Sequence, residues 1–235
     1  MAAESQVLVN TEKKYIAKFF SDAAESDVKK VDLSTLTWAK HTITLSGAAS
    51  PNFKIGEVLT VGAEKYLVTG FTAGASTVEV VGWDNTNKKA TAIDASSSSS
   101  DAVSGGVSGN NTRTYSSIAE QDFNVLVTKI MWITNGLQVK IEWDGSGAEA
   151  AIVELAGNGS WSMPGNEWPG LPINAAGDAS EVLGDIQFST TGHGSGDSYT
   201  IIMELKKQAP GFDIPAYEEN TSLGYKVDYL LGNFT

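Results

Sequence analysis

The stretch Leu137-Gln138-Val139-Lys140-Ile141-Glu142-Trp143 alternates between apolar and polar side chains at every position. Side chains of a β-strand point to opposite faces in turn, so this pattern predicts a strand with one buried and one solvated face. A run rich in β-branched residues, residues 123–134, precedes it, and the intervening Asn135-Gly136 readily supplies the positive φ angles of a two-residue turn. We therefore predict a β-hairpin formed by residues 123–134 and 137–143.

Other segments of the chain show the same period of two. Residues 182–188 alternate in this way, and so do residues 199–206, whose second face is only partly polar and is therefore expected to be covered as well. Together with the hairpin, these segments predict an all-β fold with an antiparallel, jelly-roll-like β-sandwich over residues 112–208. Shorter strand patterns separated by turn residues suit a smaller β-barrel-like module, and they lie at residues 7–9, 15–20, 42–45, 57–61, 65–69 and 77–81.

A segment rich in Ser and Gly, residues 95–111, divides the chain. It has too few apolar side chains to offset the entropy of ordering it, so we interpret it as a linker or mobile loop. The predicted parts are then residues 1–94 with the N-terminal strands and the small module, the sandwich over residues 112–208, and a C-terminal extension over residues 209–235. In an equally compatible topology, the strands before Thr37 join the sandwich and residues 38–93 form an insertion.

Composition and charge restrict the classes of function. The 235 residues include no Cys, which excludes disulfides, thiolate zinc sites and cysteine nucleophiles. A formal net charge of −12 disfavours nucleic acid as a partner and favours a basic protein surface. No apolar run approaches the roughly 20 residues that span a bilayer, and the first residues lack the pattern of a secretory signal, so we expect no membrane partner and no export by that route.

The sequence contains only incomplete versions of catalytic and metal-binding motifs. His41 precedes a strand pattern, and the Ser, His and Asp of residues 191–197 lie too close together in a glycine-rich loop to be assumed to form a catalytic triad. Residues 84–87 resemble part of a calcium loop but lack its later Gly and Glu. Carboxylates that could form a glycosidase pair are better explained as solvated charges on strand faces, and these are Glu142, Asp144, Glu149 and Glu154. We predict no catalytic residue, no cofactor and no metal ligand.

Aromatic residues outside the core pattern are the candidate partner contacts. Trp132 and Trp143 are expected in the core or as partners across two adjacent strands. Trp161 and Trp168 fall in a Pro/Gly-rich loop, residues 160–170, where they could fill the end of the sandwich, contact another subunit or stack on a sugar. Four further aromatics lie in the C-terminal extension, which either packs on its own domain or docks on a neighbouring subunit; they are Tyr217, Tyr225, Tyr229 and Phe234.

Several strand patterns are similar to those of a known class of proteins. Residues 129–132 and 140–145, followed by residues 184–190 and 198–207, resemble virion structural proteins of tailed bacteriophages, particularly phages of marine bacteria and cyanobacteria, and residues 53–60 resemble the small β modules of such proteins. The resemblance implies a non-enzymatic, multi-copy or homo-oligomeric virion protein, assembled in the host cytoplasm, that decorates or cements the capsid through contacts with the major capsid protein or other virion proteins. The alternatives are a neck, tail or fibre-associated protein, or a carbohydrate-binding module for host recognition.

Overall fold

The computed structural model describes residues 4–46, 53–93, 101–104, 114–120, 123–144, 150–162, 171–172, 185–209 and 211–213. Strands dominate this part of the chain, and its single helical element is the short 3₁₀ turn η1 (Leu33–Thr35). The chain divides into two compact units. Unit 1 comprises Met1–Leu33 and Asp122–Ala209, and unit 2 comprises Ser34–Gln121 and Pro210–Thr235.

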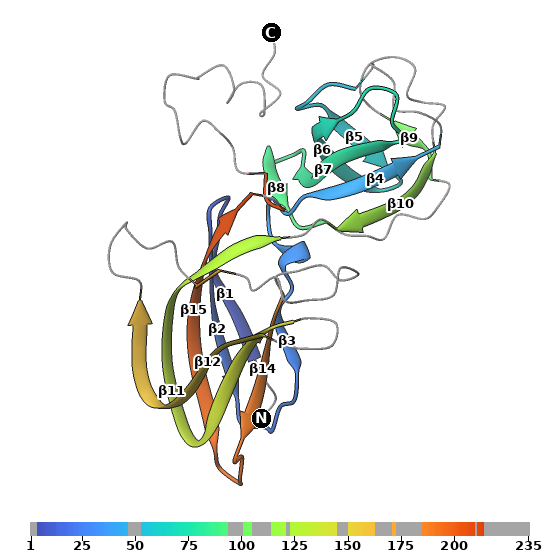
Figure 1. Cartoon of the computed structure of the whole chain (residues 1–235). Coiled ribbons are helices and arrows are strands. Elements are labelled where there is room, and N and C mark those ends of the chain that lie inside the picture. The colour runs from blue at the N-terminus through green and yellow to red at the C-terminus, as the bar shows by residue number, and fades with distance from the viewer. Residues whose placement is uncertain are drawn as a thin grey trace, which may run out of the picture. The chain divides into compact units, whose positions relative to one another are not determined.

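Unit 1 is built around one antiparallel sheet (Figure 1). Its hydrogen-bonded order is β1-β2-β15-β11-β14-β3, with β12 and β13 also paired to β11. The strands are β1 (Glu4–Asn10), β2 (Lys14–Ser21), β3 (Val28–Val31), β11 (Asn124–Trp143), β12 (Ala150–Ser162), β13 (Leu171–Pro172), β14 (Ile186–Thr191) and β15 (Ser198–Gln208). Strands near the start of the chain therefore pair with strands near its end.

The predicted hairpin at Asn135-Gly136 is wrong. Residues 124–143 form one continuous 20-residue strand, β11. Its first half pairs with β15 and its second half with β14, while β12 pairs with parts of both halves. Gly136 has a φ of 78°, but this positive φ serves a bend within the strand. Figure 1 shows that β11 curls sharply between its two ends. The bend brings the two halves of the strand into opposite layers of unit 1.

Aromatic side chains join these two layers. The ring of Phe188, on β14, lies edge-on to Phe19 of β2 at 5.2 Å between centroids and 6.0 Å from the ring of Tyr199 on β15. All three side chains are almost completely buried. Because β14 contacts β2 and β15 through side chains rather than through backbone pairing, the curled sheet packs against itself as a sandwich, which confirms the predicted fold class.

Unit 2 contains a smaller antiparallel sheet. Its order is β10-β4-β7-β6-β5-β9, with β8 paired to β7. An isolated bridge between Ala102 and Thr114, and a hydrogen bond of 2.9 Å from the Tyr115 N–H to the Asp101 carbonyl, join the two end strands, so the sheet closes on itself. This closure confirms the barrel-like module. The strands are β4 (His41–Leu45), β5 (Val58–Val61), β6 (Glu64–Phe71), β7 (Thr77–Asp84), β8 (Lys89–Thr91), β9 (Val103–Ser104) and β10 (Tyr115–Glu120).

Two segments outside the predicted module contribute to unit 2. Strand β9 lies within residues 95–111, which the sequence suggests as a linker, and pairs with β5. Residues 211–213 also return to this unit, where Phe212 is buried and forms a bridge with Ala39. Within the described ranges, no helix is long and apolar enough to cross a membrane.

Candidate functional site

The outer face of unit 1 carries an exposed apolar surface. Met131 and Ile133 of β11 lie opposite Ile202 and Thr200 of β15, and we call these four residues the outer patch. Met131 is 38% exposed and Ile133 is 63% exposed, whereas the adjacent Ile130 points into the core and is buried. Large apolar side chains at two neighbouring positions on the solvent side of a sheet are typical of a surface that contacts another molecule.

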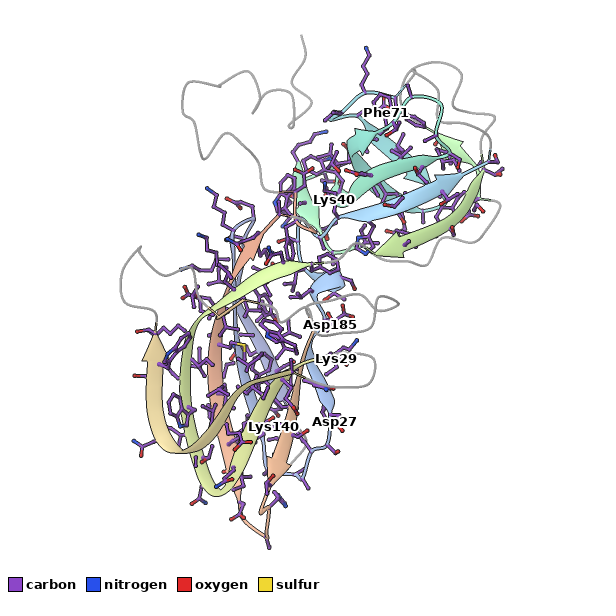
Figure 2. The ribbon with its side chains drawn as sticks, viewed as in Figure 1. Asp27, Lys29, Lys40, Phe71, Lys140 and Asp185 are labelled. Atoms are coloured by element: carbon purple, nitrogen blue, oxygen red, sulfur yellow. The ribbon has the colours of Figure 1, made fainter. Side chains whose placement is uncertain are left out.

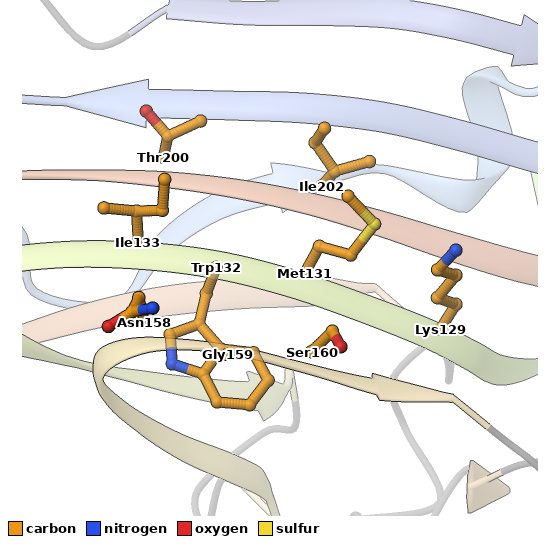
Figure 3. A pocket seen from close by; sticks show the side chains of 9 residues that line it. All are labelled: Lys129, Met131, Trp132, Ile133, Asn158, Gly159, Ser160, Thr200 and Ile202. Atoms are coloured by element: carbon orange, nitrogen blue, oxygen red, sulfur yellow. The ribbon is translucent and has the colours of Figure 1, made fainter.

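The outer patch borders a shallow depression of about 460 Å³ (Figure 3). Its other side is formed by Asn158, Gly159 and Ser160 of β12 and by the indole of Trp132. This indole donates a hydrogen bond of 3.2 Å to the Ala156 carbonyl and lies against Gly159, where an added Cβ would be only 2.5 Å from the ring. The missing side chain at position 159 therefore makes room for the ring.

The same face continues onto β2. Phe20 lies opposite Thr200 and Ile16 opposite Glu204, and both apolar side chains are half-buried. The charged residues of this face are mainly basic, although the whole chain has a net charge of −12. Four exposed lysines stand on it against two glutamates, and they are Lys14, Lys18, Lys129 and Lys206 against Glu4 and Glu204. The apolar surface therefore has a predominantly basic margin.

A buried polar cluster fixes the loop between β2 and β3. The Glu25 carboxylate accepts hydrogen bonds from the Lys30 ammonium at 2.6 Å and from the Tyr199 hydroxyl at 2.7 Å. Burial, together with the hydrogen bond to Glu25, raises the pKa of Tyr199, so this hydroxyl stays protonated. The Thr190 N–H also donates to the Glu25 carbonyl, which ties the loop to β14. These contacts hold structure together, and their polar atoms already have partners.

A second polar cluster lies beside β3, where β14 begins (Figure 2). Lys29 contacts Asp185 at 2.7 Å and Asp144 at 3.2 Å, and Asp185 also accepts a hydrogen bond of 2.8 Å from the Leu33 N–H. Burial raises the pKa of Asp185 in spite of these partners. Hydrogen bonding to Asp185 raises the pKa of Lys29. The lysine occupies the position between the two carboxylates, and no group of three metal-ligating side chains occurs in the described part of the chain.

The carboxylates considered as a glycosidase pair have different environments. Glu142 was expected to be solvated but is only 2% exposed and contacts Lys140, so that expectation was wrong for this residue. Asp144 contacts Lys29, Glu154 is exposed on β12, and Glu149 lies outside the described residues. The sequence could not reveal the burial of Glu142, because its position in an alternating strand gives only the face on which it lies.

The two histidines lie in different units and contact backbone oxygens. His41 is buried at the start of β4, with Nδ1 3.2 Å from the Ala39 carbonyl. His193 has Nε2 3.1 Å from the Asp22 carbonyl, while Asp197 accepts a hydrogen bond of 2.7 Å from the Gly194 N–H. In residues 84–87, Asp84 accepts hydrogen bonds from Thr86 and Asn87, as in an ordinary polar turn.

The predicted partner-contact residues fall in two groups. Trp161 is wrongly assigned to a loop, because it lies in β12 opposite Ile130 and is half-buried. Trp132 and Trp143 are likewise not on two adjacent strands but both on β11, with Trp143 buried in the core. The remaining candidates lie outside the described residues, and they are Trp168, Tyr217, Tyr225, Tyr229 and Phe234.

The outer patch is not among the sites predicted from the sequence. One signal for it was present, since residues 130–133 are apolar on both faces of the strand and residues 199–206 have a second face that is only partly polar. That both segments lie side by side, with Met131 opposite Ile202, required knowledge of the sheet register.

The comparisons with known proteins do not show a family for this chain. No protein-family model and no curated protein matches the chain. One similar solved structure is described as "Complete structure of manganese lipoxygenase of Gaeumannomyces graminis and partial structure of zonadhesin of Komagataella pastoris"; it is 12% identical, and the match covers 83% of this chain and 78% of that one with a TM-score of 0.12. A TM-score this low supports no conclusion about fold or function.

Proposed function

We propose that this protein is a non-enzymatic virion structural protein of a tailed phage that decorates or cements the capsid through protein–protein contacts. The observation that carries the proposal is the outer patch, in which Met131 and Ile133 stand exposed on the solvent side of a well-packed sheet. The strand patterns that resemble phage virion proteins supply the class of assembly.

The outer patch has properties suited to a stable contact. Its side chains come from two hydrogen-bonded strands, so the backbone that carries them is already ordered and does not have to be fixed when a partner covers them. Apolar side chains that a partner removes from water supply favourable free energy. The lysines at the margin favour a partner with acidic groups around an apolar centre, in contrast to the basic surface that the net charge of the whole chain favours. The major capsid protein or another virion protein with such a surface is the proposed partner.

The proposal can be tested with purified particles of the phage whose genome would encode the chain. We expect mass spectrometry of purified virions to find the protein in many copies and immunogold electron microscopy to place it on the head. Protein added to particles that lack it should bind, and Ile133→Asp should weaken that binding on the order of tenfold or more, because a charge replaces buried apolar surface. The matched control is Ile55→Asp, since Ile55 is an isoleucine of unit 2 that is 42% exposed.

Two results would contradict the proposal. Absence of the protein from purified virions would exclude a structural role in the virion. Equal binding of the Ile133→Asp and Ile55→Asp variants would show that the outer patch is not the contact surface.

A further inference from the structure

Strand β1 is an open edge of the sheet in unit 1. Among the described strands, β1 pairs only with β2, and none of them hydrogen-bonds to its other side. Two apolar side chains on it are exposed, with Val7 55% and Leu8 46% accessible. Open edges of this kind readily accept a further strand from another chain.

The other described edges of this sheet carry features that oppose such pairing. Strand β3 is only four residues long and contains Lys29 and Lys30. Strand β12 is longer, but its pairing with β11 is interrupted by two irregularities of register, and Gly157 within it has a φ of 66°. Strand β1 has seven residues, neither Lys nor Pro, and one irregularity, between Val7 and Val9. It is therefore the least protected edge.

The sequence contains a segment suited to this edge. In residues 223–231, one set of alternate positions is entirely apolar and the other contains Gly, Lys, Asp and Leu. This period of two predicts a strand with one buried face. The apolar set is Leu223, Tyr225, Val227, Tyr229 and Leu231.

We propose that residues 223–231 of one copy add as a strand to β1 of a second copy. The backbone of the added strand would hydrogen-bond to the open side of β1, and its apolar face would cover Val7. Exposed aromatic and β-branched side chains paired across strands are among the more stabilising combinations in a sheet. Because each copy carries both a donor segment and an acceptor edge, the contact joins two different surfaces of like copies.

The donor segment has enough chain to reach a neighbour. Residues 214–222 separate it from Asp213, the last residue described in unit 2, and nine residues extend to about 30 Å. The proposal rests on the proposed function, since copies held close together on a particle favour pairing between chains. It uses a surface different from the outer patch, so the two can fail separately.

Sedimentation velocity of the full chain over a range of concentrations provides the test. We expect concentration-dependent self-association, which Val227→Asp weakens on the order of tenfold to a hundredfold by placing a charge on the apolar face. The matched control Asp228→Lys changes the opposite face of the same segment and should associate like the original chain. On the acceptor side, Val7→Lys should weaken association as Val227→Asp does.

A peptide of residues 214–235 tests the donor segment and the acceptor strand β1 separately. It should bind a chain that stops after Asp213, which keeps the buried Phe212 of unit 2, and should not bind the same chain carrying Val7→Lys. A full chain that stays monomeric at all concentrations, or equal association of the Val227→Asp and Asp228→Lys variants, would overturn the proposal. Ile133→Asp should leave self-association unchanged, so loss of particle binding alone would count against the proposed function and not against this contact.

Discussion

Replacing Lys207 by methionine should change how the stability of unit 1 depends on pH. The Lys207 side chain is only 1% exposed, and its ammonium donates hydrogen bonds to Asn10 Oδ1 at 2.7 Å and to the Thr11 carbonyl at 2.8 Å. Burial lowers the pKa of Lys207 to about 7, although the charge of Glu12 opposes the shift. Removing a charged group from water disfavours its charged form, and neutral acceptors compensate only in part.

The sign and size of the effect follow from proton linkage. In the unfolded chain, Lys207 has its ordinary pKa of 10.5, so between about pH 7 and that value the unfolded state binds one more proton than the folded state. The free energy of unfolding therefore rises with pH from this group, with a slope that approaches roughly 1.4 kcal/mol per pH unit above pH 7. Because about half of the folded molecules still carry the proton at pH 7, the rise from about pH 7 to about pH 9 is about 2 kcal/mol. The Lys207→Met variant lacks this contribution.

Chemical denaturation at a series of pH values measures the effect. The difference in unfolding free energy between the original chain and Lys207→Met should change by about 2 kcal/mol across this interval. In this variant, Asn10 Oδ1 and the Thr11 carbonyl lose their donor, which lowers the free energy of unfolding. This loss is the same at every pH, so it does not change the slope of unfolding free energy against pH. The neighbouring Lys206 is exposed, so Lys206→Met is the control and should give a curve parallel to the original. Parallel curves for Lys207→Met as well would refute the reasoning.

Three further substitutions test the packing of unit 1. Phe188→Ala should lower the free energy of unfolding by about 3–5 kcal/mol in denaturant titrations, because its ring joins both layers; a loss below about 1 kcal/mol would contradict this. Tyr199→Phe should cost about 1–3 kcal/mol by the same assay, since buried Glu25 loses a donor, and no loss would show the hydroxyl to be dispensable. Gly159→Val should displace the Trp132 indole and change the near-ultraviolet circular dichroism, whereas an unchanged spectrum would place the ring elsewhere.

The class of fold could be predicted because alternation is a local signal. The buried Leu137, Val139 and Ile141 are on the face expected from the sequence. The partner of this strand could not be predicted, since Asn135-Gly136 satisfies a hairpin turn and a bend within a strand equally well. Only the pairing of the two halves with β15 and β14, which are distant in sequence, decides between the two.

The candidate site was harder to predict than the fold. The sequence around Trp161, with Ser on both sides and Pro and Gly nearby, has a composition typical of a loop. Trp161 nevertheless lies in β12 and belongs to its long pairing with β11. The outer patch combines residues about 70 positions apart, and nothing in a local pattern shows that Met131 and Ile202 lie opposite each other.

Two irregularities in β11 explain both the missed hairpin and the outer patch. The side chains that face the core occupy odd positions at Val125 and Val127, an even position at Ile130, and odd positions again at Leu137, Val139 and Ile141, while Leu126 and Glu142 are buried on the opposite face. The first change of phase coincides with a register shift between Val127 and Lys129, and the second with the bend at Gly136. Because a shift of one residue exchanges the two faces of a strand, the bulge at Thr128 is what directs Ile130 into the core and leaves Met131 and Ile133 facing solvent. An uninterrupted strand would instead place Lys129 opposite Met203 in the core, so the exposed apolar surface is a consequence of the register that keeps this lysine in water.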